Sequence, residues 1–163
     1  MSSLDQFLAR HSIVMPCFDH PSATTCADFD LLNLNLPAVK TKNLFLRDKK
    51  GTRHFLLAVE PHKKVDLASL ASAIGVGRLG MASERRLDEY LGVLPGSVSI
   101  LALFQDTGNQ VELIMDEALW EATAIQAHPL KNTKTLIVSH ANLRKFLEVT
   151  EHKANVISIP ETC

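Results

Sequence analysis

The sequence predicts an α+β fold built around a mixed, curled β-sheet. Short stretches rich in β-branched and aromatic residues are interspersed with amphipathic stretches that carry helix caps, without the regular strand–helix alternation of a parallel α/β fold. Two turn-forming stretches, Asp48-Lys49-Lys50-Gly51 and Asp106-Thr107-Gly108-Asn109, each separate β-type segments. Because 46% of the 163 residues are hydrophobic, we expect one packed core and a single domain over residues 1–163.

The composition excludes several classes of protein. Seven Gly and seven Pro exclude collagen-like character. The longest apolar runs have five residues, whereas a membrane-spanning helix needs about 20, and the N-terminus lacks the pattern of a signal peptide. The 17 Lys and Arg balance 18 Asp and Glu, which argues against a general nucleic-acid coat protein. Cys17, Cys26 and Cys163 are an odd number without CxxC spacing, so we expect reduced thiols in a soluble, cytoplasmic protein.

Local signals in the first half of the chain predict two helices and a hairpin. Ser3 and Gln6 fit a capping box at the start of the first helix. The expected elements are a helix over 3–11, an extended segment over 13–18, a weaker helix opened by Thr25 and ended by Pro37, and strands over 43–47 and 52–60. The two strands flank the first of the turns named above and are therefore predicted to pair as a hairpin.

The second half is predicted to mix helices with further strands. Pro95-Gly96 forms a turn into an apolar strand, and Asp106–Asn109 is expected to form a second hairpin turn. The expected elements are helices over 66–75 and 83–92, strands over 97–104 and 110–115, a helical turn over 116–120, strands over 123–127 and 134–139, a helix capped by Ser139 and a strand over 156–159.

Several motifs suggest chemistry that their context does not support. Residues 75–80 match GxGxxG, but they follow a predicted helix instead of a strand, so they are interpreted as a helix C-cap and a turn. Histidines at HxxxH spacing, a cysteine ligand pair and a GxSxG elbow are all missing from the sequence, so no metal site is predicted. A hydrolytic triad assembled from distant Ser, His and Asp residues stays open.

Two segments stand out as candidate functional sites. Residues 40–53 hold six basic residues and one acid, and Lys42 and Asn43 stand at the mouth of a predicted strand. An ammonium fixed there could hold a phosphate or a developing oxyanion. The second segment is the loop from Ala127 to Thr133, where Pro129 restricts the backbone and biases His128 toward an extended conformation. Such a loop can direct backbone groups at a ligand, although a His-Pro loop taken alone is more often structural.

Taken together, these segments resemble the YbaK-like aminoacyl-tRNA deacylases. The resemblance is carried, in chain order, by Asp19-His20-Pro21, Lys42-Asn43-Leu44-Phe45-Leu46, Gly77-Arg78-Leu79, Leu91-Gly92-Val93 with Pro95-Gly96-Ser97-Val98, and His128-Pro129-Leu130-Lys131-Asn132. It spans nearly the whole chain and is most similar to the free-standing homologues of the prolyl-tRNA synthetase editing domain. The most similar subgroup removes alanine from mischarged proline tRNA.

The resemblance implies an α+β domain with a mixed, barrel-like sheet and surrounding helices, and it assigns roles to particular residues. Lys42 would be the essential lysine that contacts the terminal nucleotide or the ester as it becomes negative, and Asn43 would neighbour the aminoacyl group. His128 and Pro129 would position water and substrate, largely through backbone groups. An aminoacyl ester is already activated, so water and a ribose hydroxyl could complete hydrolysis without a protein nucleophile, a metal or another cofactor.

Position alone suggests which residues form the walls of the amino-acid pocket. The candidates are Met15, Cys17, Thr24 and Ala127. Alanine-specific members of the family tend to have an aromatic residue immediately before His-Pro, where this chain has Ala127. The resemblance makes alanine the leading substrate. Because the smaller side chain of Ala127 could enlarge the pocket, serine, threonine or a slightly larger non-protein amino acid stay open.

The expected partner is the acceptor end of a misacylated tRNA. Lys40, Arg47, Arg78 and Lys131 are the candidate contacts to the tRNA, which predicts salt-sensitive activity. Prolyl-tRNA synthetase or an elongation factor would be further partners, and the oligomeric state stays open. The alternatives are a tRNA-binding module without catalysis and an enzyme of the same fold that acts on a different small ester or amide.

Overall fold

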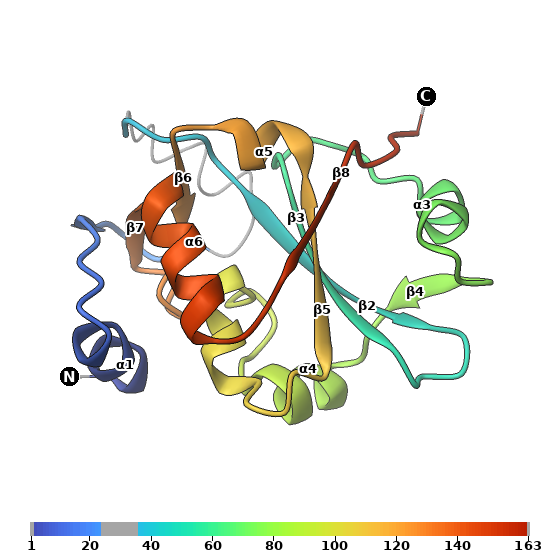
Figure 1. The fold of residues 1–163 in the computed structure, drawn as a ribbon, viewed down its shortest axis with the longest axis horizontal. Helices are drawn as coiled ribbons and strands as arrows, with labels where there is room; N and C mark the ends of the chain where they lie inside the picture. Colours follow the sequence, from blue (N-terminus) through green and yellow to red (C-terminus); the bar gives the residue numbers. More distant parts are fainter. Residues whose placement is uncertain (1, 24–35, 163) are drawn as a thin grey trace.

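The structure, a computed structural model, describes residues 2–23 and 36–162 and contains two β-sheets covered by short helices (Figure 1). One sheet has five strands in the order β4-β2-β3-β5-β8, and the other has three in the order β1-β7-β6. The pairs β3–β5 and β5–β8 are parallel and the remaining pairs are antiparallel. The predicted α+β fold with mixed strand pairing is thus confirmed, with its strands divided between two sheets.

The five-stranded sheet is built on the predicted hairpin. β2 (Lys42–Asp48) pairs with β3 (His54–Val59), and the Asp48 carboxylate accepts backbone hydrogen bonds from Thr52 and Arg53 across the turn. Gly51 supplies the left-handed conformation that this turn requires, with φ of +71°. The sheet is completed by β4 (Leu79–Met81), β5 (Val111–Asp116) and β8 (Ala154–Ile157).

The three-stranded sheet contains β1 (Cys17–Asp19), β6 (Ala124–Ala127) and β7 (Lys134–Ser139). β7 has the bounds that the sequence predicts, whereas the extended segment expected over 13–18 becomes a regular strand only at Cys17. Pro16 accepts a hydrogen bond from the Ile137 N–H but has no N–H to donate, so regular pairing begins after it.

The helices are α1 (Ser3–Arg10), α3 (Leu67–Ile74), α4 (Glu84–Leu91), α5 (Glu117–Glu121) and α6 (His140–Val149). The predicted caps of α3, α4 and α6 are confirmed, and the GxGxxG segment indeed starts as a helix C-cap at Gly75. The predicted cap of α1 is wrong by one residue, because Ser2 and Asp5 form the capping box. The Asp5 carboxylate accepts the Ser2 N–H, and the Ser2 hydroxyl accepts the Asp5 N–H. The helix predicted between Thr25 and Pro37 lies almost wholly in residues 24–35, outside the described residues.

The strand predicted over 97–104 is wrong, because this segment contains the 3₁₀ helix η1 (Ile100–Gln105). The Ser99 hydroxyl accepts the Leu101 N–H at its start, and residues 100–103 are buried. In a short run of consecutive apolar residues, the spacing of hydrophobic residues does not distinguish a strand from a helix. Asp106–Asn109 therefore connects η1 to β5 instead of forming a second hairpin.

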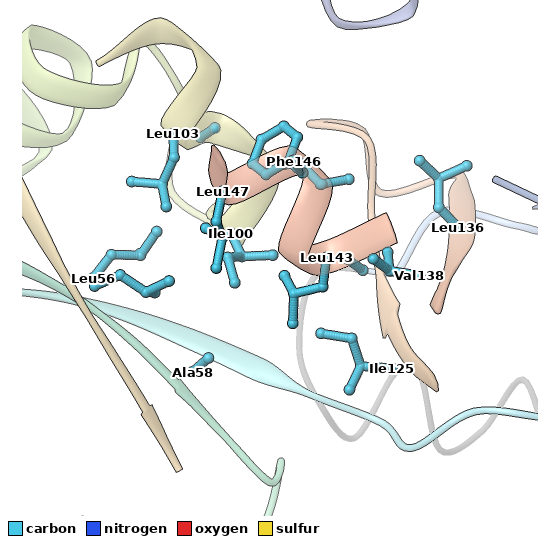
Figure 2. Packing of buried hydrophobic residues seen from close by; sticks show 14 of the residues in the cluster. Leu56, Ala58, Ile100, Leu103, Ile125, Leu136, Val138, Leu143, Phe146 and Leu147 are labelled. Carbon is cyan, nitrogen blue, oxygen red and sulfur yellow. The ribbon is translucent and has the colours of Figure 1, made fainter. Parts of the chain in front are cut away.

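The side chains of β3 alternate between two hydrophobic clusters, one on each face of the five-stranded sheet. Leu56 and Ala58 join the larger cluster with η1, α6 and the three-stranded sheet, and Figure 2 shows these side chains converging from the different elements. Phe55 and Leu57 join the smaller cluster with α3. In Figure 1, α6 and α3 accordingly lie on opposite sides of the sheet. Among the described residues, no helix is both long and apolar enough to cross a membrane.

Candidate active site

The structure joins the start of β2 to the end of β6, which brings the two predicted functional segments together along the backbone. Val39 accepts the Gln126 N–H at 2.8 Å and donates its own N–H to Ala124 at 3.0 Å. The Thr41 hydroxyl then donates to the Gln126 carbonyl at 2.6 Å. Lys42 follows directly on one side of this junction, and the loop that contains His128 follows on the other.

The Lys42 ammonium is fixed by a backbone carbonyl. Its Nζ donates to the carbonyl of Lys63 at 2.7 Å, and the side chain is half-buried. Successive side chains of a strand point to opposite faces, so Lys42 lies on the face of Leu44 and α3 while Asn43 lies on the other face. Lys42 is the first residue of β2, so the cation stands at the mouth of a strand as the sequence predicts. Its partner in the described part of the chain is the Lys63 carbonyl.

Asn43 connects β2 to η1 through both ends of its amide group. Its Nδ2 donates to the Leu57 carbonyl at 3.2 Å, and its Oδ1 accepts the Ile100 N–H at 3.2 Å. Ile100 is the first residue of η1, whose N–H has no partner within the helix. The amide of Asn43 thereby fixes the position of η1 beside β2.

The loop after β6 is tightly constrained around His128 and Pro129. Pro129 is buried, and the following Leu130 has φ of +63°, a left-handed conformation that bulky side chains rarely adopt. Burial and then the neighbouring positive charge of His20 lower the pKa of His128 to about 4. The imidazole is therefore neutral at pH 7, which fits a role in shaping the loop and not in supplying charge.

Two residues at this loop were missed as candidate site residues, His20 and Thr135. Nδ1 of His20 lies 2.8 Å from the Pro21 carbonyl, which can only accept, so this nitrogen carries a proton. The other ring nitrogen, Nε2, forms a hydrogen bond with the Thr135 hydroxyl at 2.8 Å. The His20 N–H also donates to the Thr133 carbonyl at 2.9 Å. His20 belongs to the Asp19-His20-Pro21 motif of the sequence, whereas Thr135 carries no local signal.

The predicted pocket residues lie along the three-stranded sheet. Cys17 and Ala127 both pair with Leu136, one from each side, so the three side chains form a row on one face. Ala127 is only 4% exposed and packs in the larger cluster. A groove of about 280 Å³ beneath α1 brings together the predicted residues Met15, Cys17, Pro129 and Lys131. Thr24 lies outside the described residues.

The four predicted tRNA contacts fall into two groups. Lys40 lies within the junction, between Val39 and Thr41, and Lys131 lies in the loop after His128. Arg47 pairs with Gly80 at the far end of β2, so it lies close to the exposed Arg78 that precedes β4. The rise of a strand, about 3.3 Å per residue, puts this second group roughly 17 Å from Lys42. Arg47 is further fixed by donating to the carbonyls of Asp48 and Lys49.

Comparison with known proteins identifies the family. Residues 20–146 match the family described as the aminoacyl-tRNA editing domain, and this range contains both sides of the junction and His20. The chain belongs to the aminoacyl-tRNA editing domain family. It is accordingly an aminoacyl-tRNA deacylase, an enzyme that hydrolyses the ester between an amino acid and tRNA.

Similar proteins match nearly the whole chain. A prolyl-tRNA synthetase associated domain-containing protein 1 from Danio rerio is 38% identical over 157 residues, which is 95% of this chain and 85% of that protein. The prolyl-tRNA editing protein ProX of Acetoanaerobium sticklandii is 28% identical over 159 residues, covering 98% of this chain and 94% of that protein. A crystal structure of a candidate trans-editing enzyme for prolyl tRNA synthetase shares the fold, with a TM-score of 0.70, 18% identity and 99% coverage of both chains.

Proposed function

We propose that residues 1–163 form one trans-editing domain that acts in the cytoplasm. It hydrolyses the ester bond between alanine and mischarged tRNA(Pro). The observation that carries the proposal is the 2.6 Å hydrogen bond from Thr41 to the Gln126 carbonyl, because it holds Lys42 and the His128–Pro129 loop on adjoining backbone. The ProX relative, a prolyl-tRNA editing protein by name, supports the choice of tRNA.

The reaction requires positioning and charge stabilisation more than a strong nucleophile. Water attacks the ester carbonyl, the carbonyl oxygen becomes negative, and the bond to the terminal ribose oxygen breaks, releasing alanine and tRNA. A neighbouring ribose hydroxyl of the substrate positions or activates the water. Lys42 contributes its positive charge at the developing oxyanion through a free N–H while another N–H keeps donating to the Lys63 carbonyl, and the loop around Pro129 orients the ester through backbone groups.

Size selection explains why such an enzyme is needed. A synthetase pocket shaped for proline discriminates weakly against the smaller alanine, since one methylene is worth only about 1–3 kcal/mol. A separate editing site corrects the error by admitting alanine and rejecting proline sterically. Met15, Cys17, Thr24 and Ala127 are proposed to set this limit. The small Ala127 leaves serine, threonine or a slightly larger non-protein amino acid as alternative substrates.

Recognition of the tRNA is proposed to use both groups of basic residues. Lys40 and Lys131 flank the site and would contact the unpaired acceptor end, while Arg47 and Arg78, roughly 17 Å away along the strand, would reach phosphates of the acceptor stem. Prolyl-tRNA synthetase or an elongation factor is proposed to supply mischarged tRNA, because the formal charge of −1 predicts modest intrinsic affinity for RNA.

The experiment is a panel of radiolabelled Ala-, Ser-, Thr- and Pro-tRNA presented to the purified protein. We expect release of alanine from Ala-tRNA(Pro) and intact Pro-tRNA(Pro). Preferential release of serine or threonine would change the substrate assignment. Binding of tRNA without release of any amino acid would reject catalysis in favour of a binding module, and equal hydrolysis of free aminoacyl esters would reject tRNA as the recognised substrate.

A further inference from the structure

We propose that Lys63 and Asp116 are positioning residues that fix the ammonium of Lys42. The inference deepens the proposed function and rests on its use of Lys42 as the stabilising cation. Lys63 acts twice: its backbone carbonyl accepts the Lys42 Nζ at 2.7 Å, and its own Nζ donates to Asp116 Oδ2, also at 2.7 Å. The carbonyl that holds Lys42 is therefore attached to a residue whose side chain is itself anchored.

The anchor is a largely buried ion pair. The side chain of Lys63 is 15% exposed and that of Asp116 is 6% exposed. Asp116 ends β5, and its second oxygen, Oδ1, accepts the Ile159 N–H at 3.3 Å. Removing one partner of a buried pair leaves an uncompensated charge, so the two side chains strongly prefer to remain together. The pair thus ties the Lys63 segment, between β3 and α3, to β5, an interior strand of the five-stranded sheet.

The surroundings of Lys63 argue that it holds Lys42 and does not bind RNA itself. Lys63 lines a cavity of about 320 Å³ together with Asp116 and other acidic side chains, which are Glu60, Glu117, Glu121 and Glu161. These carboxylates attract the Lys63 ammonium and repel RNA phosphates. The backbone carbonyl of the same residue accepts the hydrogen bond that orients Lys42. This arrangement keeps the cation of Lys42 in place before substrate binds, and so lowers the reorganisation required in the transition state.

The test compares deacylation by Lys63→Met with deacylation by Lys64→Met, a matched control at the exposed neighbouring lysine. We expect Lys63→Met to lower kcat about tenfold, with KM changed less than about twofold, because misplacing a catalytic group affects the chemical step. Lys64→Met should match the wild type, and Lys63→Arg, which retains the ion pair, should recover most of kcat. An unchanged kcat in Lys63→Met would overturn the proposal.

A double-mutant cycle separates positioning from general damage to the fold. In a Lys42→Met background, Lys63→Met should cause no further loss of kcat, since its effect passes through Lys42. If the kcat of the double variant falls by the full product of the two single-variant losses, the proposal is overturned. If Lys63→Met fails to fold because Asp116 is left unpaired, the same cycle is run with the double variant Lys63→Met/Asp116→Asn, which removes the buried charge together with its partner.

A measurement without tRNA keeps this proposal distinguishable from the proposed function. Nitrogen-15 relaxation of the Lys42 ammonium group should report restricted motion in the wild type and in Lys64→Met, and greater motion in Asp116→Asn. Equal motion in all three proteins would overturn the positioning role even if the protein deacylates tRNA. Conversely, a wild type with a restricted Lys42 and no deacylase activity would reject the proposed function alone.

Discussion

The Thr41 hydroxyl donates a 2.6 Å hydrogen bond to the carbonyl of Gln126, linking the start of β2 in the five-stranded sheet to β6 in the three-stranded sheet. Lys42 and the loop at His128 follow directly on either side of this bond. The junction between the two sheets is therefore also the place where the proposed catalytic segments meet. This bond therefore fixes the backbone spacing between Lys42 and the loop that contains His128.

Thr41→Val should affect activity more than stability. Loss of one neutral hydrogen bond costs about 1 kcal/mol in the free energy of unfolding, whereas a small shift between Lys42 and the His128 loop should lower kcat roughly tenfold. Thr150→Val is the matched control, because the Thr150 hydroxyl also donates to a backbone carbonyl, that of Leu147, at the end of α6. Denaturant unfolding and deacylation kinetics check both variants, and equal kcat losses in the two would contradict a special role for the junction.

Thr135→Val should weaken the contact between the His20 motif and the loop. The buried hydroxyl of Thr135 is the partner of His20 Nε2, and valine keeps the shape of the side chain while removing the hydroxyl. We expect a loss of about 1 kcal/mol in unfolding free energy together with reduced deacylation, and Thr135→Ser should recover both. If Thr135→Val deacylates at the wild-type rate, the hydroxyl–imidazole pair serves stability only.

Acidification should destabilise the protein between about pH 6.5 and pH 4. The pKa of His128 falls from its usual 6.5 to about 4 in the folded protein, so the unfolded chain binds the proton first. The unfolding free energy therefore decreases as pH falls through this window, by up to about 1.4 kcal/mol per pH unit for one histidine. Burial and the Arg86 charge lower the pKa of His54 and add in the same direction. Urea unfolding across this range should show a shallower pH dependence in His128→Asn, and an unchanged slope would contradict the assignment.

Arg78→Ala should weaken tRNA binding without changing the chemical step. Removing one phosphate contact should raise KM and reduce the slope of log affinity against log salt by about one, with kcat retained. Arg144→Ala, an exposed arginine on α6, provides the control and should resemble the wild type. Titrations of tRNA at several salt concentrations measure the slope, and equal slopes in the two variants would remove Arg78 from the interface.

Elements with strong local signals could be predicted from the sequence. The hairpin follows from the Asp48–Gly51 turn, and α3 and α4 end where Gly75 and Gly92 adopt left-handed conformations. These features depend on neighbours within a few residues. The segment over 97–104 could not be predicted in this way, since residues 100–103 of η1 are all buried and its cap, Ser99, differs little from any serine in a strand.

The candidate site was predictable in its motifs but not in its contacts. The resemblance located Lys42 and His128-Pro129 along the chain, and the strand start at Lys42 agrees with the local pattern. The partner of Lys42 is 21 residues away, and His20 and Thr135 are 115 residues apart. Such pairs arise from the arrangement of strands in the folded protein, so no local pattern of residue types predicts them.

The central claim is that the positive charge of Lys42 stabilises the transition state of ester hydrolysis. The most direct measurement is the single-turnover rate of alanine release from Ala-tRNA(Pro) by the wild type and by Lys42→Ala, with both proteins shown to be folded. Loss of a preorganised group that stabilises the oxyanion predicts a rate lower by about 10²–10³-fold in the variant. Release of alanine by Lys42→Ala at the wild-type rate would contradict the account.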